Sequence, residues 1–82
     1  MADESLLVDV AERIVSIRTG LGWEIELAAE MAHLEPERLA EAEAGESALT
    51  ETELQGLADA FGVDITAFFG GRTTPMSYLF GG

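Results

Sequence analysis

The 82-residue chain contains no cysteine and no lysine, and four arginines stand against 16 Asp and Glu residues. The absence of cysteine excludes disulfides, thiolate metal ligands and a nucleophilic thiol. The formal charge of −12 repels phosphate backbones and anionic lipid surfaces, so the composition does not favour a nucleic-acid partner. No apolar run approaches the roughly 20 residues that span a bilayer, and the acidic N-terminus lacks the basic start of a secretory signal. We therefore expect a cytoplasmic protein.

Apolar residues make up 48% of the chain, which is enough for one small folded domain. They first recur at steps of three and four, the spacing of one helical face, and this predicts a helix from about Ser5 to Thr19. A second short helix is expected within residues 24–34. The apolar positions of the first helix are Leu7, Val10, Ile14, Ile17 and Leu21, and the candidate buried positions of the second are Leu27, Ala28, Met31 and Ala32.

Proline, glycine and capping residues mark the next helices. Pro36 suits a first helical turn, and Gly45 suits a left-handed helix end, so a third helix is predicted from Glu35 to Ala44. Thr50 and Glu53 have the spacing of a capping box, which predicts a fourth helix that ends before residue 62.

The C-terminal part begins with a fifth short helix and ends in an apolar segment. Asp64 is a candidate N-cap, and Phe68 and Phe69 are expected to point inward from this helix. Beyond it, apolar residues alternate at period two, which indicates a strand or an extended arm.

Five short helices with these boundaries resemble the Cro/C1-type (XRE) helix-turn-helix family from about Val10 to Phe69. The stretches that carry the resemblance are GWEIELAAEMAHL at 22–34, EPERLAEAEAGE at 35–46 and LQGLADAFGVDITAFF at 54–69. His33 departs from the family pattern, which usually has glycine there. The resemblance implies an all-α, five-helix lambda-repressor-like helix-turn-helix domain over residues 1–71, with a short extended C-terminal arm over residues 72–82. It also implies a noncatalytic transcriptional regulator, and an ion pair between Arg18 and Glu43.

In this family the start of the second helix contacts phosphate and the third helix reads base edges. The matching positions here hold Ile25 in the second helix and Pro36, Glu37 and Glu41 in the third. None of these side chains donates a hydrogen bond to DNA. From residue 24 to residue 53, ten acidic residues and one arginine, Arg38, give a local charge of −10 + 1 = −9. Specific DNA binders instead neutralise several phosphates.

We therefore interpret the third helix as an acidic surface that faces a protein. The expected partner is basic: another DNA-binding regulator, or a toxin, since some members of the resembled family are antitoxins. The expected contact residues are Glu35, Pro36, Glu37, Arg38 and Glu41 of the third helix, with Ile25 and Glu30 of the second. Two other functions remain open. One is a homodimeric, sequence-specific DNA-binding repressor that reads through Arg38, Arg13 or Arg72; the other is a purely structural oligomerising module.

A homodimer is the expected assembly, because a domain of this size cannot easily bury all of its C-terminal apolar side chains. The alternative is that the arm folds back over its own core. Enzymatic activity, a cofactor and a metal site are not expected: a small helical domain has little room for a pocket, and His33 with Glu30 and Glu37 makes a poor ligand set. The dimer candidates are Phe68, Phe69, Met76, Tyr78, Leu79 and Phe80.

Overall fold

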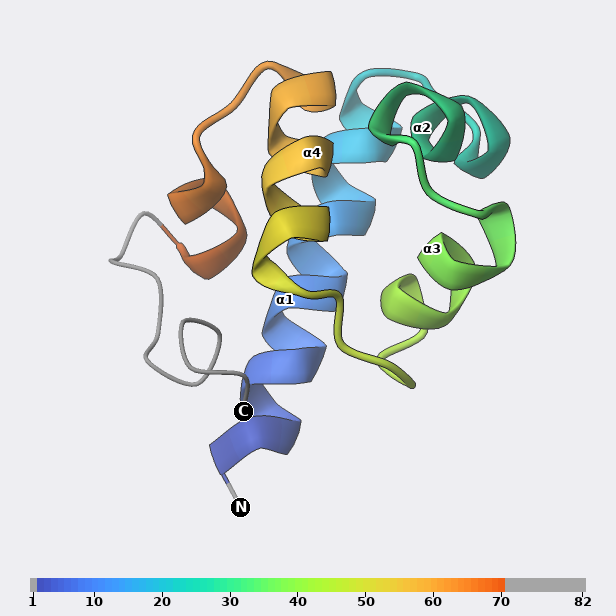
Figure 1. The fold of residues 1–82 in the computed structure, drawn as a ribbon. Helices are drawn as coiled ribbons and strands as arrows, with labels where there is room; N and C mark the ends of the chain where they lie inside the picture. Colours follow the sequence, from blue (N-terminus) through green and yellow to red (C-terminus); the bar gives the residue numbers. More distant parts are fainter. Residues whose placement is uncertain (1, 71–82) are drawn as a thin grey trace.

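The computed structural model describes residues 2–70, and side chains from residue 7 onward (Figure 1). All regular structure in this part of the chain is helical. The elements are α1 (Ala2–Gly20), α2 (Ile25–Ala32), α3 (Pro36–Glu43), α4 (Glu51–Phe61) and the 3-10 helix η1 (Ile65–Phe69). The expected fifth helix is therefore a 3-10 turn and not an α-helix, and α1 begins three residues earlier than predicted. The expected C-terminal arm lies outside the described residues.

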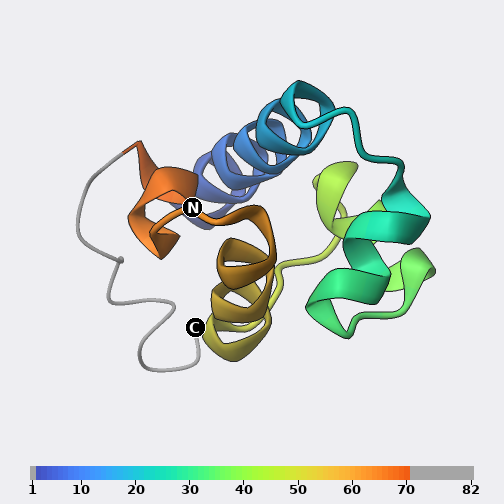
Figure 2. The same cartoon turned by 90° about the horizontal axis from the view of Figure 1, so that it is seen from above.

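The five elements pack as a closed ring around one core. α1 packs on α3, α3 on α2, α2 on α4, α4 on η1, and η1 returns to α1. Seen from above, α2 and α3 lie at one end of this ring and η1 lies at the other (Figure 2). Every element thus contributes to the core, and α3 keeps one side free at the edge of the molecule.

The core contains buried side chains from all five elements. Side-chain caps fix the first residues of α4 and η1. At α4 the Thr50 hydroxyl accepts from the Glu53 N–H at 3.1 Å, and at η1 Asp64 Oδ1 accepts from the Thr66 N–H at 3.0 Å. This second bond lowers the pKa of Asp64. The largest fully buried side chains are Ile14, Leu39, Leu54, Leu57 and Phe68.

The prediction that Leu27 and Met31 are buried is wrong, because these side chains are 42% and 51% exposed. α2 instead faces the core with alanines, and it approaches α4 closely. A Cβ added at Gly56 of α4 would lie 3.4 Å from the carbonyl oxygen of Ala32. Large side chains do not fit between two helices at this separation. Leu21 is also exposed, at 44%, because it follows the end of α1 in the turn to α2.

His33 ends α2 in the left-handed conformation, with φ 61° and ψ 41°. This conformation costs a residue with a Cβ about 1 kcal/mol. We therefore expect His33→Gly to raise the free energy of unfolding by about 0.5–1 kcal/mol, measured by urea denaturation. His33→Ala keeps the Cβ and should bring no such gain. An equal gain in both variants would mean that the imidazole, and not the backbone, is the source of strain.

Candidate recognition surface on α3

α3 presents acidic side chains to solvent because Leu39 and Ala42 turn its apolar side toward the core. Leu39 and Ala42 are buried, at spacing three. Pro36 occupies the first turn, where its missing N–H costs nothing. The side chains that remain on the outside include Glu37 and Glu41, which are four residues apart and therefore neighbours on the helix. The exposed side of α3 is thus dominated by carboxylates.

Arg38 is the one cation of α3, and its guanidinium is hydrogen-bonded to other residues of the same chain. Its Nε and Nη2 atoms donate to the two carboxylate oxygens of Glu53, at 3.2 and 2.8 Å. Nη1 donates to the Ser47 hydroxyl at 2.8 Å, and Nη2 also donates to the Ala48 carbonyl oxygen at 3.2 Å. The guanidinium therefore makes four hydrogen bonds to its own chain and faces the loop between α3 and α4.

Glu53 joins this cluster to the start of α4. One of its carboxylate oxygens accepts both from Arg38 and from the Thr50 backbone N–H, at 2.8 Å each. The hydrogen bond from Arg38 is the largest cause that lowers the pKa of Glu53, and the same bond raises the pKa of Arg38. The Arg38–Glu53 pair thus fixes α3 to α4 and neutralises the one α3 cation among the arginines that the DNA-binding hypothesis invokes. The sequence predicted the capping box but not this pair.

The lowered pKa of Glu53 makes stability depend on pH. The carboxylate is stabilised in the folded state, so its contribution is present above its ordinary pKa of 4.5 and is lost as the pH falls through the lower folded value. We expect the free energy of unfolding to decline below about pH 4.5, and less steeply in Glu53→Gln. Urea denaturation at a series of pH values from about 3 to about 6 measures this dependence. Parallel curves for the two proteins would contradict the role of Glu53.

Arg18 and Glu43 form a second, more enclosed ion pair between α1 and α3. Nε of Arg18 donates to Glu43 Oε2 at 2.6 Å, and Nη2 donates to Oε1 at 2.9 Å. Nη1 donates to the Trp23 carbonyl oxygen at 2.8 Å. The two side chains are 13% and 7% exposed. The hydrogen bond to Glu43 raises the pKa of Arg18, so this pair fixes α3 against the long helix.

Glu43→Ala is expected to lower the free energy of unfolding by about 2–3 kcal/mol, because it leaves a largely buried guanidinium with one backbone partner. Replacing both Arg18 and Glu43 by Met should cost less than the sum of Arg18→Met and Glu43→Met made singly, since no unpaired charge remains. Urea denaturation of the four proteins measures the coupling. Additive losses would mean that the two side chains contribute independently.

The other expected site residues are distributed differently from the prediction. Glu30 is exposed on α2, but Ile25 packs partly buried against the core and does not face outward as a contact residue. Phe68 and Phe69 are 0% and 2% exposed, so both lie in the core and neither offers a free surface to a second copy of the chain. Met76, Tyr78, Leu79, Phe80 and Arg72 lie outside the described residues.

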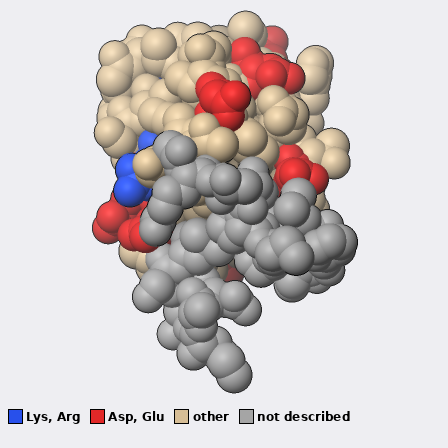
Figure 3. All heavy atoms as spheres, turned by 90° about the vertical axis from the view of Figure 1, so that its left-hand side faces the viewer, with Lys and Arg blue, Asp and Glu red and all other residues tan. Residues whose placement is uncertain are grey.

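Arg13 lies on α1 on the side that faces η1. Its guanidinium is next to the end of η1: a Cβ added at Gly70 would lie 3.1 Å from Nη2 of Arg13. Figure 3 views this η1 side, where acidic groups (red) are scattered and basic atoms (blue) gather in one place. Negative charge is therefore not confined to α3. A test of the α3 surface needs a control variant with the same charge change elsewhere on the molecule.

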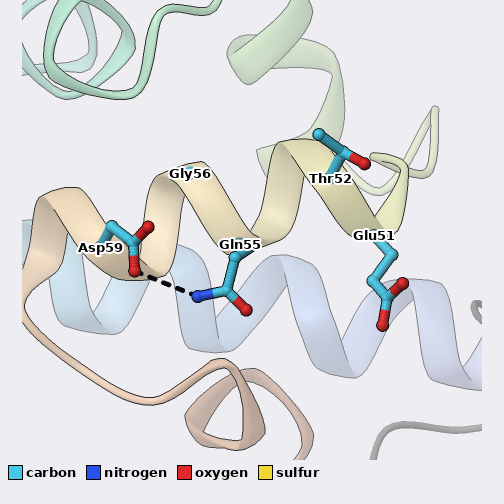
Figure 4. A pocket seen from close by; sticks show the side chains of 5 residues that line it. All are labelled: Glu51, Thr52, Gln55, Gly56 and Asp59. Carbon is cyan, nitrogen blue, oxygen red and sulfur yellow. Dashed lines mark hydrogen bonds between the residues drawn. The ribbon is translucent and has the colours of Figure 1, made fainter.

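Residues 2–70 hold no group of three His, Cys, Asp or Glu placed to bind a metal ion. A shallow groove runs along the outer side of α4, lined by Glu51, Thr52, Gln55, Gly56 and Asp59 (Figure 4). Its polar side chains are partly paired with each other, since Gln55 Nε2 donates to Asp59 Oδ1 at 3.0 Å. No helix in the described part is both long and apolar enough to cross a membrane.

The helix arrangement and the exposed α3 define a helix-turn-helix domain, and comparison with known proteins agrees. The family model HTH_3, described as helix-turn-helix, matches residues 14–68. The chain therefore belongs to this family of noncatalytic transcription regulators, which confirms the resemblance to the Cro/C1-type proteins. A search of curated proteins finds no match.

Two solved structures share the fold. The restriction-modification controller protein C.AhdI from Aeromonas hydrophila is 24% identical, with a TM-score of 0.75 over 77% of this chain and 96% of its own. An HTH_3 family transcriptional regulator from Vibrio cholerae is 21% identical, with a TM-score of 0.81 over 93% of this chain. The match covers 47% of the Vibrio protein, so this chain spans about half of its length.

Proposed function

We propose that the protein is a noncatalytic transcription regulator that acts by binding through its helix-turn-helix domain. The family match over residues 14–68 supports this function. The two structural relatives, a controller protein and a transcriptional regulator, are consistent with it.

The comparisons favour the form of this function in which a homodimer binds DNA sequence-specifically. In that form α3 would enter the major groove. Arg38 would then have to leave Glu53, and it would be the one cation on the helix as Glu37 and Glu41 approach the phosphates. Each like-charge approach costs on the order of 1 kcal/mol near a protein surface. DNA binding of this kind therefore needs compensating contacts from elsewhere in the dimer.

The geometry of α3 favours a second form, in which the same surface binds a basic protein. The observation that carries it is the Arg38–Glu53 pair: the one cation of α3 makes its hydrogen bonds within the chain. The exposed carboxylates are then left to pair with Lys or Arg of a partner. Such charges mainly raise the rate and the specificity of association.

Fluorescence anisotropy separates the two forms. The full chain is titrated onto a labelled duplex from upstream of its own gene, and onto a scrambled duplex, at about 50 and 200 mM salt. Tight, sequence-dependent binding supports the DNA form. Failure to bind, together with capture of a basic partner that Glu37→Lys and Glu41→Lys abolish, supports the protein form. If the chain binds neither duplex nor any basic protein, the regulator proposal itself fails and a purely structural module remains.

A further inference from the structure

Two large apolar side chains lie on the outer side of α2. Leu27 is 42% exposed and Met31 is 51% exposed. They are four residues apart, so their side chains are neighbours along the helix. The core does not need them, because α2 contributes Ala28, Ala29 and Ala32 to it. Their apolar surface is therefore available to another molecule.

Carboxylates lie on either side of Leu27. Glu24 lies three residues before Leu27 and Glu30 three residues after it, the spacing of neighbours on a helix. Both glutamates are exposed, and no lysine or arginine occurs between residues 19 and 37. We call these four residues the α2 patch. It combines an apolar centre with a negative border.

We propose that the α2 patch binds an amphipathic helix of a partner protein, with apolar side chains along one face and Lys or Arg beside them. The apolar face covers Leu27 and Met31, and the basic side chains pair with Glu24 and Glu30. A second copy of this chain fits poorly, because it would bring the same carboxylates together. The patch shares Glu30 with the contact surface expected for a basic partner, but its apolar centre lies on α2, so the proposal holds whether α3 binds DNA or protein.

Binding of a synthetic amphipathic peptide to the chain tests this proposal. The probe is a fluorescently labelled amphipathic helix of about 18 residues, made of Leu on one face and Lys on the other. The full chain is titrated by anisotropy at about 150 mM salt, where exposed charge alone is largely screened. The exchange of Leu27 and Met31 for Gln keeps every charge and is expected to raise the dissociation constant about tenfold, because the apolar contact is lost.

Two controls isolate the patch. Val8→Gln removes an exposed apolar side chain from α1, where Val8 is 47% exposed, and should leave the dissociation constant unchanged. A peptide of the same composition, with leucines spread around the helix, should bind the wild-type chain more weakly. Equal affinity of wild type and the Leu27→Gln, Met31→Gln double variant would overturn the proposal. It would also fail if that double variant changed self-association, measured by light scattering, and not peptide binding.

Discussion

Phe68→Ala is expected to remove a large part of the stability of the fold. Phe68 is fully buried in η1, and its ring packs edge-on against Phe61 at a centroid distance of 6.2 Å. Loss of a buried phenyl group costs about 3–5 kcal/mol, and a domain of this size has a total of only about 4–12 kcal/mol. Because η1 closes the ring between α4 and α1, the loss should affect the whole domain.

Circular dichroism during thermal and urea denaturation measures this effect. Phe68→Leu keeps most of the buried volume and is the matched control, with an expected loss of about 1–2 kcal/mol. If Phe68→Ala lowered the free energy of unfolding by less than about 1 kcal/mol, η1 would not be part of the core.

The double change Glu37→Lys and Glu41→Lys is expected to strengthen the binding of duplex DNA. It replaces the two exposed carboxylates of α3 by cations and changes the net charge from −12 to −8, since each change adds two. Two new phosphate contacts should steepen the salt dependence by about 1.8 in log–log slope, and at about 50 mM salt the affinity should rise at least about tenfold. Fluorescence anisotropy with a random-sequence duplex measures both quantities.

Asp9→Lys and Glu12→Lys form the matched control, because they make the same charge change on the exposed side of α1. The control should bind DNA only slightly better than wild type. If both double variants gained affinity equally, total charge would explain the effect and the α3 surface would have no special role.

Much of the fold follows from the sequence because local chemistry marks the helix ends. Pro36 begins α3, and Thr50 with Glu53 caps α4, as their spacing predicts. The periodicity of apolar residues wrongly predicted that Leu27 and Met31 are buried. The close approach of α2 to Gly56 decides which α2 side chains fit in the core, and it depends on the tertiary arrangement. An apolar residue at helical spacing was therefore assigned to the core although only alanine fits there.

The electrostatics of the site were only partly predictable. The Arg18–Glu43 pair was expected from the family resemblance and is present in the structure. The Arg38–Glu53 pair joins residues 15 positions apart across a loop, and no local pattern indicates it. This pair changes the interpretation of α3, since Arg38 was expected among the exposed contact residues and instead donates hydrogen bonds to Glu53 of α4.

The central claim is that Arg38 remains with Glu53 and leaves α3 without a free cation. The most direct measurement is an NMR titration of the ¹⁵N-labelled wild-type chain with duplex DNA from upstream of its gene, at about 150 mM salt, that follows the Arg38 Nε–H signal. We expect this signal and the backbone amides of α3 to keep their positions as DNA is added. A saturable shift of Arg38 together with α3, as the guanidinium leaves Glu53 for the DNA, would contradict the account.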